Sequence, residues 1–111
     1  MKKCWAFIIL LVLAGVSCSN QNKVRKPEVF LEEQQMIDVL ADAYLIEAQL
    51  NQQKSEGVDV TELQVEYYAQ LFEHYGITDS IFEQNMYYYT HHPDILERMM
   101  DSVSNRFIKA Q

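Results

Sequence analysis

The sequence predicts an all-α protein, a small bundle of about four helices behind a signal peptide and a short tether. After Pro27 the apolar residues recur at helical spacing, and no stretch of strand length alternates strictly between apolar and polar residues. The helical patterns are interrupted at Gly57, Gly76 and Pro93, residue types that commonly end or begin helices. We therefore divide the chain into a leader (1–17), a tether (18–29) and a helical domain (30–111).

The leader, MKKCWAFIILLVLAGVSC up to Cys18, has the pattern of a secretion signal. Lys2 and Lys3 precede an apolar run, and small residues stand just before Cys18. The run is too short for the roughly 20 residues of a membrane-spanning helix. Gly15-Val16-Ser17-Cys18 resembles the lipobox of bacterial lipoproteins, which implies a diacylglycerol on the Cys18 thiol and cleavage before it. An ordinary signal peptide with an incidental Cys is the alternative.

Cysteine content and charge exclude several classes of function. Cys4 leaves with the leader and Cys18 carries the lipid, so the mature chain has no thiol for a disulfide, a nucleophile or a metal. From Pro27 onward four basic residues (Lys54, Arg98, Arg106, Lys109) accompany 16 acidic ones, a net charge of −12, which repels nucleic acid. The basic tether would favour anionic head groups while the acidic body is repelled, or it is simply a polar linker.

The first helix is expected from about Leu31 to Lys54. Its apolar residues cover two neighbouring faces, far more than the stripe of about 100° that contact with a single neighbour needs. One face holds Ile37, Leu40, Ala41, Tyr44 and Ala48, and the other holds Met36, Val39, Ala43, Ile46 and Leu50. We therefore predict that this helix lies at the centre of the bundle.

The second helix has sequence signals at both ends. Thr61 and Gln64 match a capping box, and Val60 is placed to pack on Val65 as a hydrophobic staple. Gly76 is expected to end the helix in the left-handed conformation.

The corner after Gly76 is predicted to depend on one residue. Ile77 falls where a Schellman motif would pack it on Phe72, and Thr78 is the expected N-cap of the third helix. The same Ile77 is positioned to pack on Phe82.

The third helix is expected over about Asp79 to His91, with Ile81, Phe82, Met86 and Tyr89 inward. A break at His91-His92-Pro93 follows, because a proline disfavours helical geometry in the residue before it. The fourth helix, about Asp94 to Lys109, is expected to bury Ile95, Leu96, Met99, Met100, Val103 and Phe107.

Known catalytic motifs are missing from the sequence. It contains no phosphate-binding glycine loop, no HExxH pair and no GxSxG elbow. His74, His91 and His92 are the only imidazoles, and a polar helix terminus explains the adjacent pair better than a metal site does. We expect no enzymatic activity, no cofactor and no metal.

Two sets of polar residues are candidates for binding. Asp38 and Asp42 share a helix face that we expect to be solvated, with contact to a basic partner or a cation as the alternative. Tyr67 and Tyr87 fall at the edge or on the outside of their helices, as tyrosines of protein interfaces do. Together these four residues form the predicted interaction surface.

Three further polar residues lie within or beside apolar faces. Glu47, Asn85 and Arg106 each interrupt a stripe that should be buried, and burying a carboxylate without partners costs several kcal/mol. We predict a semi-buried Glu47, Asn85, Arg106 network whose role is structural rather than ligand-binding.

Several short motifs in order resemble a known family. They are Asp38-Val39-Leu40-Ala41-Asp42 with Glu47-Ala48, Tyr75-Gly76-Ile77-Thr78 with Phe82, Tyr88-Tyr89 before His92-Pro93, and Val103 with Arg106. The chain is similar over Pro27 to Phe107 to a Bacteroidota family of small lipoproteins, domain of unknown function 4296. The resemblance implies a small helical envelope domain and no particular activity. Because acidic residues are missing just after Cys18, it also implies an outer-membrane anchor facing the periplasm.

The leading hypothesis is a non-enzymatic, lipid-anchored module that binds another envelope protein. One alternative is a lipoprotein that binds a small ligand or cation. The other is an immunity or inhibitor lipoprotein whose acidic surface meets a basic toxin or hydrolase.

Overall fold

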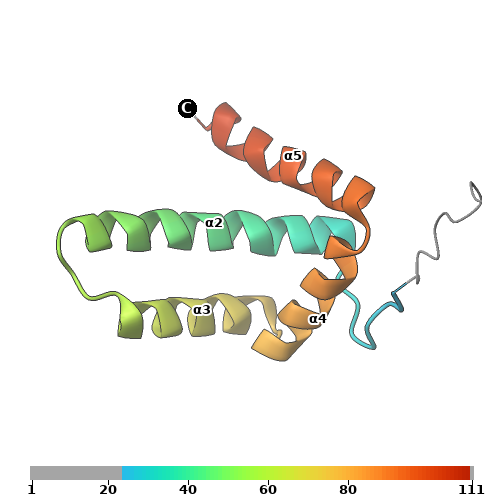
Figure 1. Ribbon diagram of the computed structural model, residues 1–111, viewed down its shortest axis with the longest axis horizontal. Helices are drawn as coiled ribbons and strands as arrows, with labels where there is room; N and C mark the ends of the chain where they lie inside the picture. The colour runs from blue at the N-terminus through green and yellow to red at the C-terminus, as the bar shows by residue number, and fades with distance from the viewer. Residues whose placement is uncertain (1–23, 111) are drawn as a thin grey trace, which may run out of the picture.

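The protein is all-α, as predicted. The computed structural model describes residues 24–110, so the leader and Cys18 lie outside the described residues. The helices are α2 (Glu33–Ser55), α3 (Thr61–Tyr75), α4 (Asp79–Thr90) and α5 (Pro93–Lys109), and residues 24–110 contain no strand (Figure 1).

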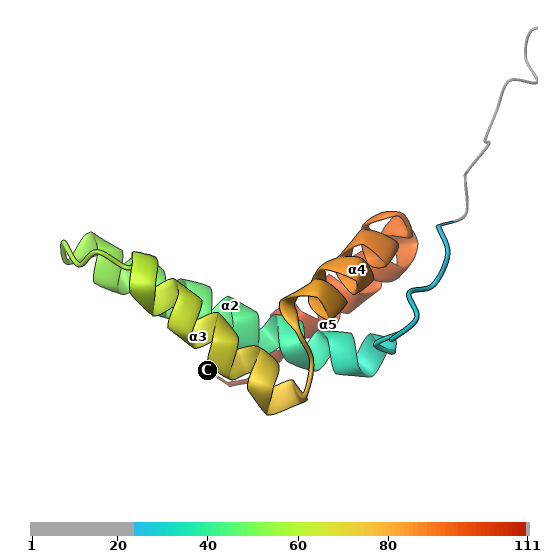
Figure 2. The same cartoon turned by 90° about the horizontal axis from the view of Figure 1, so that it is seen from below.

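The α2 helix lies at the centre of the fold, which confirms the prediction from its wide apolar surface. Its neighbours are α3 on one side and α5 on another (Figure 1). Its Val39 and Ala43 pack with Leu71 of α3, while Met36, Ile37 and Ala41 belong to a second core with α4 and α5. Figure 2 shows the resulting arrangement, in which α2 and α3 form one pair and α4 and α5 the other.

The start of α2 lies two residues after the predicted position. Gln35 accepts the backbone N–H of Glu32 at 3.2 Å, so Glu32 flanks the helix and Glu33 begins it. Leu31, predicted to be the first helical residue, precedes the helix and is buried.

The predicted cap of α3 is wrong. Thr61 is the first helical residue rather than the cap, because Asp59 accepts both its backbone N–H (3.0 Å) and its hydroxyl (2.7 Å). These hydrogen bonds lower the pKa of Asp59. Val65 is 71% exposed, so the predicted staple onto it does not form.

The corner between α3 and α4 is as predicted. Gly76 adopts a left-handed φ of 65°, and Ile77 and Gly76 donate their N–H groups to Phe72 (2.9 Å) and Glu73 (3.1 Å), the two bonds of a Schellman motif. The Thr78 hydroxyl oxygen accepts the N–H of Ile81 at 3.2 Å and caps α4. Ile77 is half-buried and packs against both cores. Phe72 and Phe82 pack against the same core as Ile77, and the centroids of their rings are 5.4 Å apart.

The break before α5 is also confirmed. The α4 helix ends at Thr90, one residue earlier than predicted, and Pro93 rather than Asp94 is the first residue of α5. Nδ1 of His91 donates to the carbonyl oxygen of Tyr87 (2.8 Å), and Nδ1 of His92 donates to that of Tyr88 (2.7 Å). Both imidazoles therefore serve the end of α4, the structural role that the sequence favoured over metal binding.

Candidate functional site

The described end of the tether is hydrogen-bonded to α4 by one buried amide. Asn85 is fully buried, and its Oδ1 accepts the N–H of Leu31 at 2.8 Å. Its Nδ2 donates to the carbonyl oxygens of Val29 and Ile81, both at 2.8 Å. The Tyr89 hydroxyl donates to the carbonyl oxygen of Leu31 at 2.6 Å. We call these contacts of Asn85 and Tyr89 the tether clamp.

Aromatic packing reinforces the tether clamp. The ring of Phe30 lies 5.1 Å from that of Tyr88 and 5.8 Å from that of Tyr89, and the ammonium of Lys26 sits 4.6 Å from the Phe30 centroid. Residues 26–31 thus leave the domain along a fixed path beside α4.

The predicted Glu47, Asn85, Arg106 network is wrong, because each residue pairs elsewhere. Glu47 accepts the Tyr68 hydroxyl at 2.5 Å, and Arg106 forms an ion pair with Asp38. Glu47 and Arg106 lie at the surface, whereas Asn85 is buried. Helical phase placed all three beside apolar faces, but it did not show that these faces point toward different neighbours.

The acidic face of α2 is bonded within the fold instead of being solvated as expected. The Tyr75 hydroxyl donates to the Asp42 carboxylate and lies 3.2 Å from the backbone oxygen of Asp38. Burial and then the bond to Asp42 raise the pKa of Tyr75 to about 12. Burial and then the bond to Glu47 raise that of Tyr68 to about 12 as well. These acidic side chains join α2 to its neighbours.

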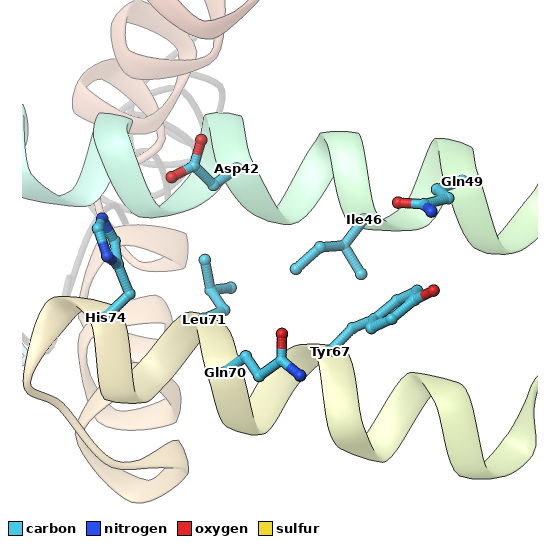
Figure 3. Close-up of a pocket in the computed structure, with 7 residues that line it drawn as sticks. All are labelled: Asp42, Ile46, Gln49, Tyr67, Gln70, Leu71 and His74. Carbon is cyan, nitrogen blue, oxygen red and sulfur yellow. The ribbon is translucent and has the colours of Figure 1, made fainter.

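A polar groove of about 370 Å³ runs between α2 and α3 (Figure 3). Asp42 and Gln49 project from α2, while Gln70 and His74 project from α3, with Ile46, Tyr67 and Leu71 completing the lining. The Tyr67 hydroxyl accepts from Gln53 at 3.4 Å. This α2–α3 groove brings two of the predicted interaction residues, Asp42 and Tyr67, together.

The other two residues of the predicted surface lie elsewhere. Asp38 pairs with Arg106 of α5, and Tyr87 is a 59% exposed residue of α4. Tyr87 lines a depression of about 690 Å³ beside the tether together with Val24, Arg25, Pro27, Glu83 and Gln84. The four residues therefore do not form one continuous surface.

An apolar groove of about 250 Å³ lies between α2 and α5, and the sequence did not predict it. Tyr44 of α2 and Met100, Val103, Ser104, Phe107 and Ile108 of α5 line this α2–α5 groove. Figure 1 shows α5 diverging from α2 toward its C-terminal end, where the rings of Tyr44 and Phe107 still meet at 5.5 Å.

The divergence leaves apolar side chains at the surface. Tyr44 is 59%, Leu45 54%, Met100 40% and Ile108 67% exposed, although Tyr44 and Met100 were predicted on buried faces. That prediction was wrong because the period of a helix gives the direction of a side chain but not whether a neighbouring helix reaches it. These four residues are half of the exposed large hydrophobic side chains within residues 24–110.

The described residues contain neither a cluster of metal-binding side chains nor a membrane-spanning helix. Within residues 24–110 no three His, Cys, Asp or Glu side chains come close enough to hold a metal ion. None of the helices in this part of the chain has the length and apolarity to cross a membrane.

Comparison with known proteins gives one match. The family model described as "Domain of unknown function (DUF4296)" matches residues 27–111. Neither the curated proteins nor the solved structures yield a match.

Proposed function

The chain belongs to the DUF4296 family, and we propose that it is a lipid-anchored cell-envelope protein whose helical domain binds another protein in the periplasm. The leader and the lipobox-like Gly15-Val16-Ser17-Cys18 support the anchor. Lipid chains on Cys18 would add roughly 0.8 kcal/mol of membrane affinity per buried CH₂, so two or three chains would hold the protein firmly.

The observation that carries the binding role is the α2–α5 groove. Single exposed apolar residues are ordinary, but several around one hollow are typical of interaction sites. Tyr44, Met100 and Ile108 surround such a hollow on a small, strongly acidic domain. A partner covering this surface would bury side chains that the domain's own helices leave open.

The tether clamp suits an anchored protein. Lys26 packs on Phe30, and Asn85 and Tyr89 fix residues 29–31 against α4, so only the segment between Cys18 and about Lys26 would act as a leash. At no more than about 3.5 Å per residue, this leash reaches about 28 Å. The domain would meet partners close to the membrane that holds it.

A second candidate function is the binding of a small polar ligand or cation in the α2–α3 groove. Its amide, carboxylate and imidazole lining favours this alternative. A native mass spectrum of protein released from envelopes would separate the two, because a bound small molecule or metal adds a discrete mass. The discriminating substitution is Gln70→Ala, which should remove that mass and leave protein partners unaffected.

The test of the proposed function is purification of the tagged, lipidated protein from detergent-solubilised envelopes of its host, with Cys18→Ala as the control. We expect a stoichiometric protein partner whose recovery requires the lipidated form. If that partner is a basic toxin or hydrolase, the protein is an immunity or inhibitor lipoprotein. A preparation without any protein partner would contradict the proposal.

A further inference from the structure

We infer that the α2–α5 groove receives one amphipathic helix of a partner protein, with an apolar face flanked by Lys or Arg. This inference rests on the proposed protein-binding role and specifies the kind of partner.

The length of the groove matches a short helical segment. On α5 its lining runs from Met100 to Ile108, a span of nine residues or about 12 Å from the first to the last at 1.5 Å per step. Three anchors at positions i, i+3 or i+4, and i+7 of a docking helix extend over about 10 Å, so they fit this length. The volume of about 250 Å³ takes only side chains, which means that the docking helix lies over the groove and inserts its apolar residues.

The two walls present suitable surfaces for a third helix. Tyr44 belongs to the side of α2 that packs in the core with α5 nearer the start of α2, where Ile37 and Ala41 are buried. Since α5 diverges, the same side of α2 is uncovered from Tyr44 onward. A docking helix would continue the packing that α5 begins, with helix axes about 8–10 Å apart.

The charges at the edges select a basic partner. At about 100° per residue, Glu97 and Asp101 lie beside Met100 and Ile108 along the outer edge of α5, and both are exposed. On α2, Glu47 lies one turn beyond Tyr44, but its carboxylate is engaged by the Tyr68 hydroxyl of α3. The basic residues Arg98 and Arg106 are engaged in ion pairs with Glu33 and Asp38. Lys or Arg flanking the anchors of a docking helix would therefore meet the carboxylates of Glu97 and Asp101 on the α5 wall.

The same charges disfavour a second copy of this chain as the occupant. Each copy carries a net charge of −12 from Pro27 onward, and two identical acidic edges would face each other across a two-fold axis. The acidic residues at the groove edge therefore attract a basic helix and repel a second copy of this chain.

The experiment places a photo-crosslinking amino acid at position 108 of the full-length, lipidated protein in its host. Position 65 of α3 is the matched control, because Val65 is 71% and Ile108 67% exposed and both are apolar helix residues. Crosslinked peptides are sequenced by mass spectrometry. We expect a partner peptide with apolar residues at i, i+3 or i+4, and i+7 flanked by Lys or Arg, captured from position 108 and not from position 65.

Substitutions give the second measurement. Ile108→Glu should reduce recovery of the partner about tenfold or more, as expected for an interface hot spot, and Val65→Glu should leave it unchanged. Both positions are exposed, so circular dichroism should show both variants folded.

Four results would overturn the inference. A partner that co-purifies but crosslinks only at other positions, or survives Ile108→Glu, leaves the protein-binding role intact and rules out the groove. A captured peptide without the amphipathic pattern or its basic flanks rules out the proposed helix. A crosslink to a second copy makes the groove a self-association site. The lack of any protein partner would remove the proposed function together with the inference.

Discussion

The tether clamp yields the sharpest stability prediction, tested by Asn85→Leu. Leucine has about the size of asparagine but no hydrogen-bonding atoms. The N–H of Leu31 then loses its only side-chain acceptor in a buried position, which costs about 1–3 kcal/mol. The carbonyl of Val29 loses a donor but lies near the surface, so water replaces part of that bond.

Two features of α4 limit the destabilisation of Asn85→Leu. The carbonyl of Ile81 keeps its helical partner inside α4, and leucine forms helices better than asparagine by about 0.5 kcal/mol. The expected net loss is about 2 kcal/mol, or a fall of roughly 8–16 °C in melting temperature for a domain of this size. Urea unfolding followed by circular dichroism measures the first quantity, and a thermal melt the second.

Hydrogen exchange provides a readout specific to the clamp. The amide of Leu31 should exchange much faster in Asn85→Leu, while the interior amides of α3 keep their relative protection. Asn105→Leu, at an exposed position of α5, is the control and should change stability by less than about 0.5 kcal/mol. If Asn85→Leu is as stable as the control variant and Leu31 stays protected, the assignment of the clamp to Asn85 is refuted.

The remaining predictions concern the contacts between helices. Because the pKa values of Tyr68 and Tyr75 are about 12 in the folded protein against about 10 when unfolded, their contribution to stability is complete below pH 10 and disappears as the pH rises to about 12. In urea titrations between pH 10 and 12, the free energy of unfolding of a variant with both Tyr68→Phe and Tyr75→Phe should fall less steeply with pH than that of the wild type. Equal slopes for the two proteins would refute the raised pKa values of these tyrosines. Ile77→Ala should cost about 2 kcal/mol at the α3–α4 corner, and a melting temperature unchanged within about 2 °C would contradict it. Arg106→Met should cost less than about 1 kcal/mol, because the ion pair with Asp38 is 41% and 39% exposed; a larger loss in denaturant titrations would show that the pair is more than a surface contact.

Helix ends whose hydrogen bonds involve sequence neighbours were predictable. The left-handed Gly76, the Thr78 cap and the break at His91-His92-Pro93 each depend on atoms within five residues, and the structure has all three. Thr61 shows the limit of such signals, because its hydroxyl donates to Asp59 while Val60 stands at the cap position without a side-chain cap bond. A local pattern can therefore indicate a cap residue whose side chain is bonded elsewhere.

The candidate sites depend on contacts between distant parts of the chain. Asn85 bonds to Leu31, 54 residues away, and periodicity carries no information about that pairing. A buried asparagine on an apolar helix face does indicate an unidentified backbone partner, and this was the available signal. The α2–α5 groove results from the direction in which α5 leaves α2, which side-chain packing between helices determines and helical phase does not.

The tether clamp also determines how the domain would respond to mechanical tension. A pull on the chain from the side of residue 24 would load the hydrogen bonds between residues 29–31 and α4 before it reached the first turn of α2. The force would therefore act first on α4, through the side chains of Asn85 and Tyr89 that bond to residues 29–31. Under such tension α2 would keep its N-terminal turn. The core that contains Met36 and Met99 would stay packed until the hydrogen bonds between Asn85 and residues 29–31 broke.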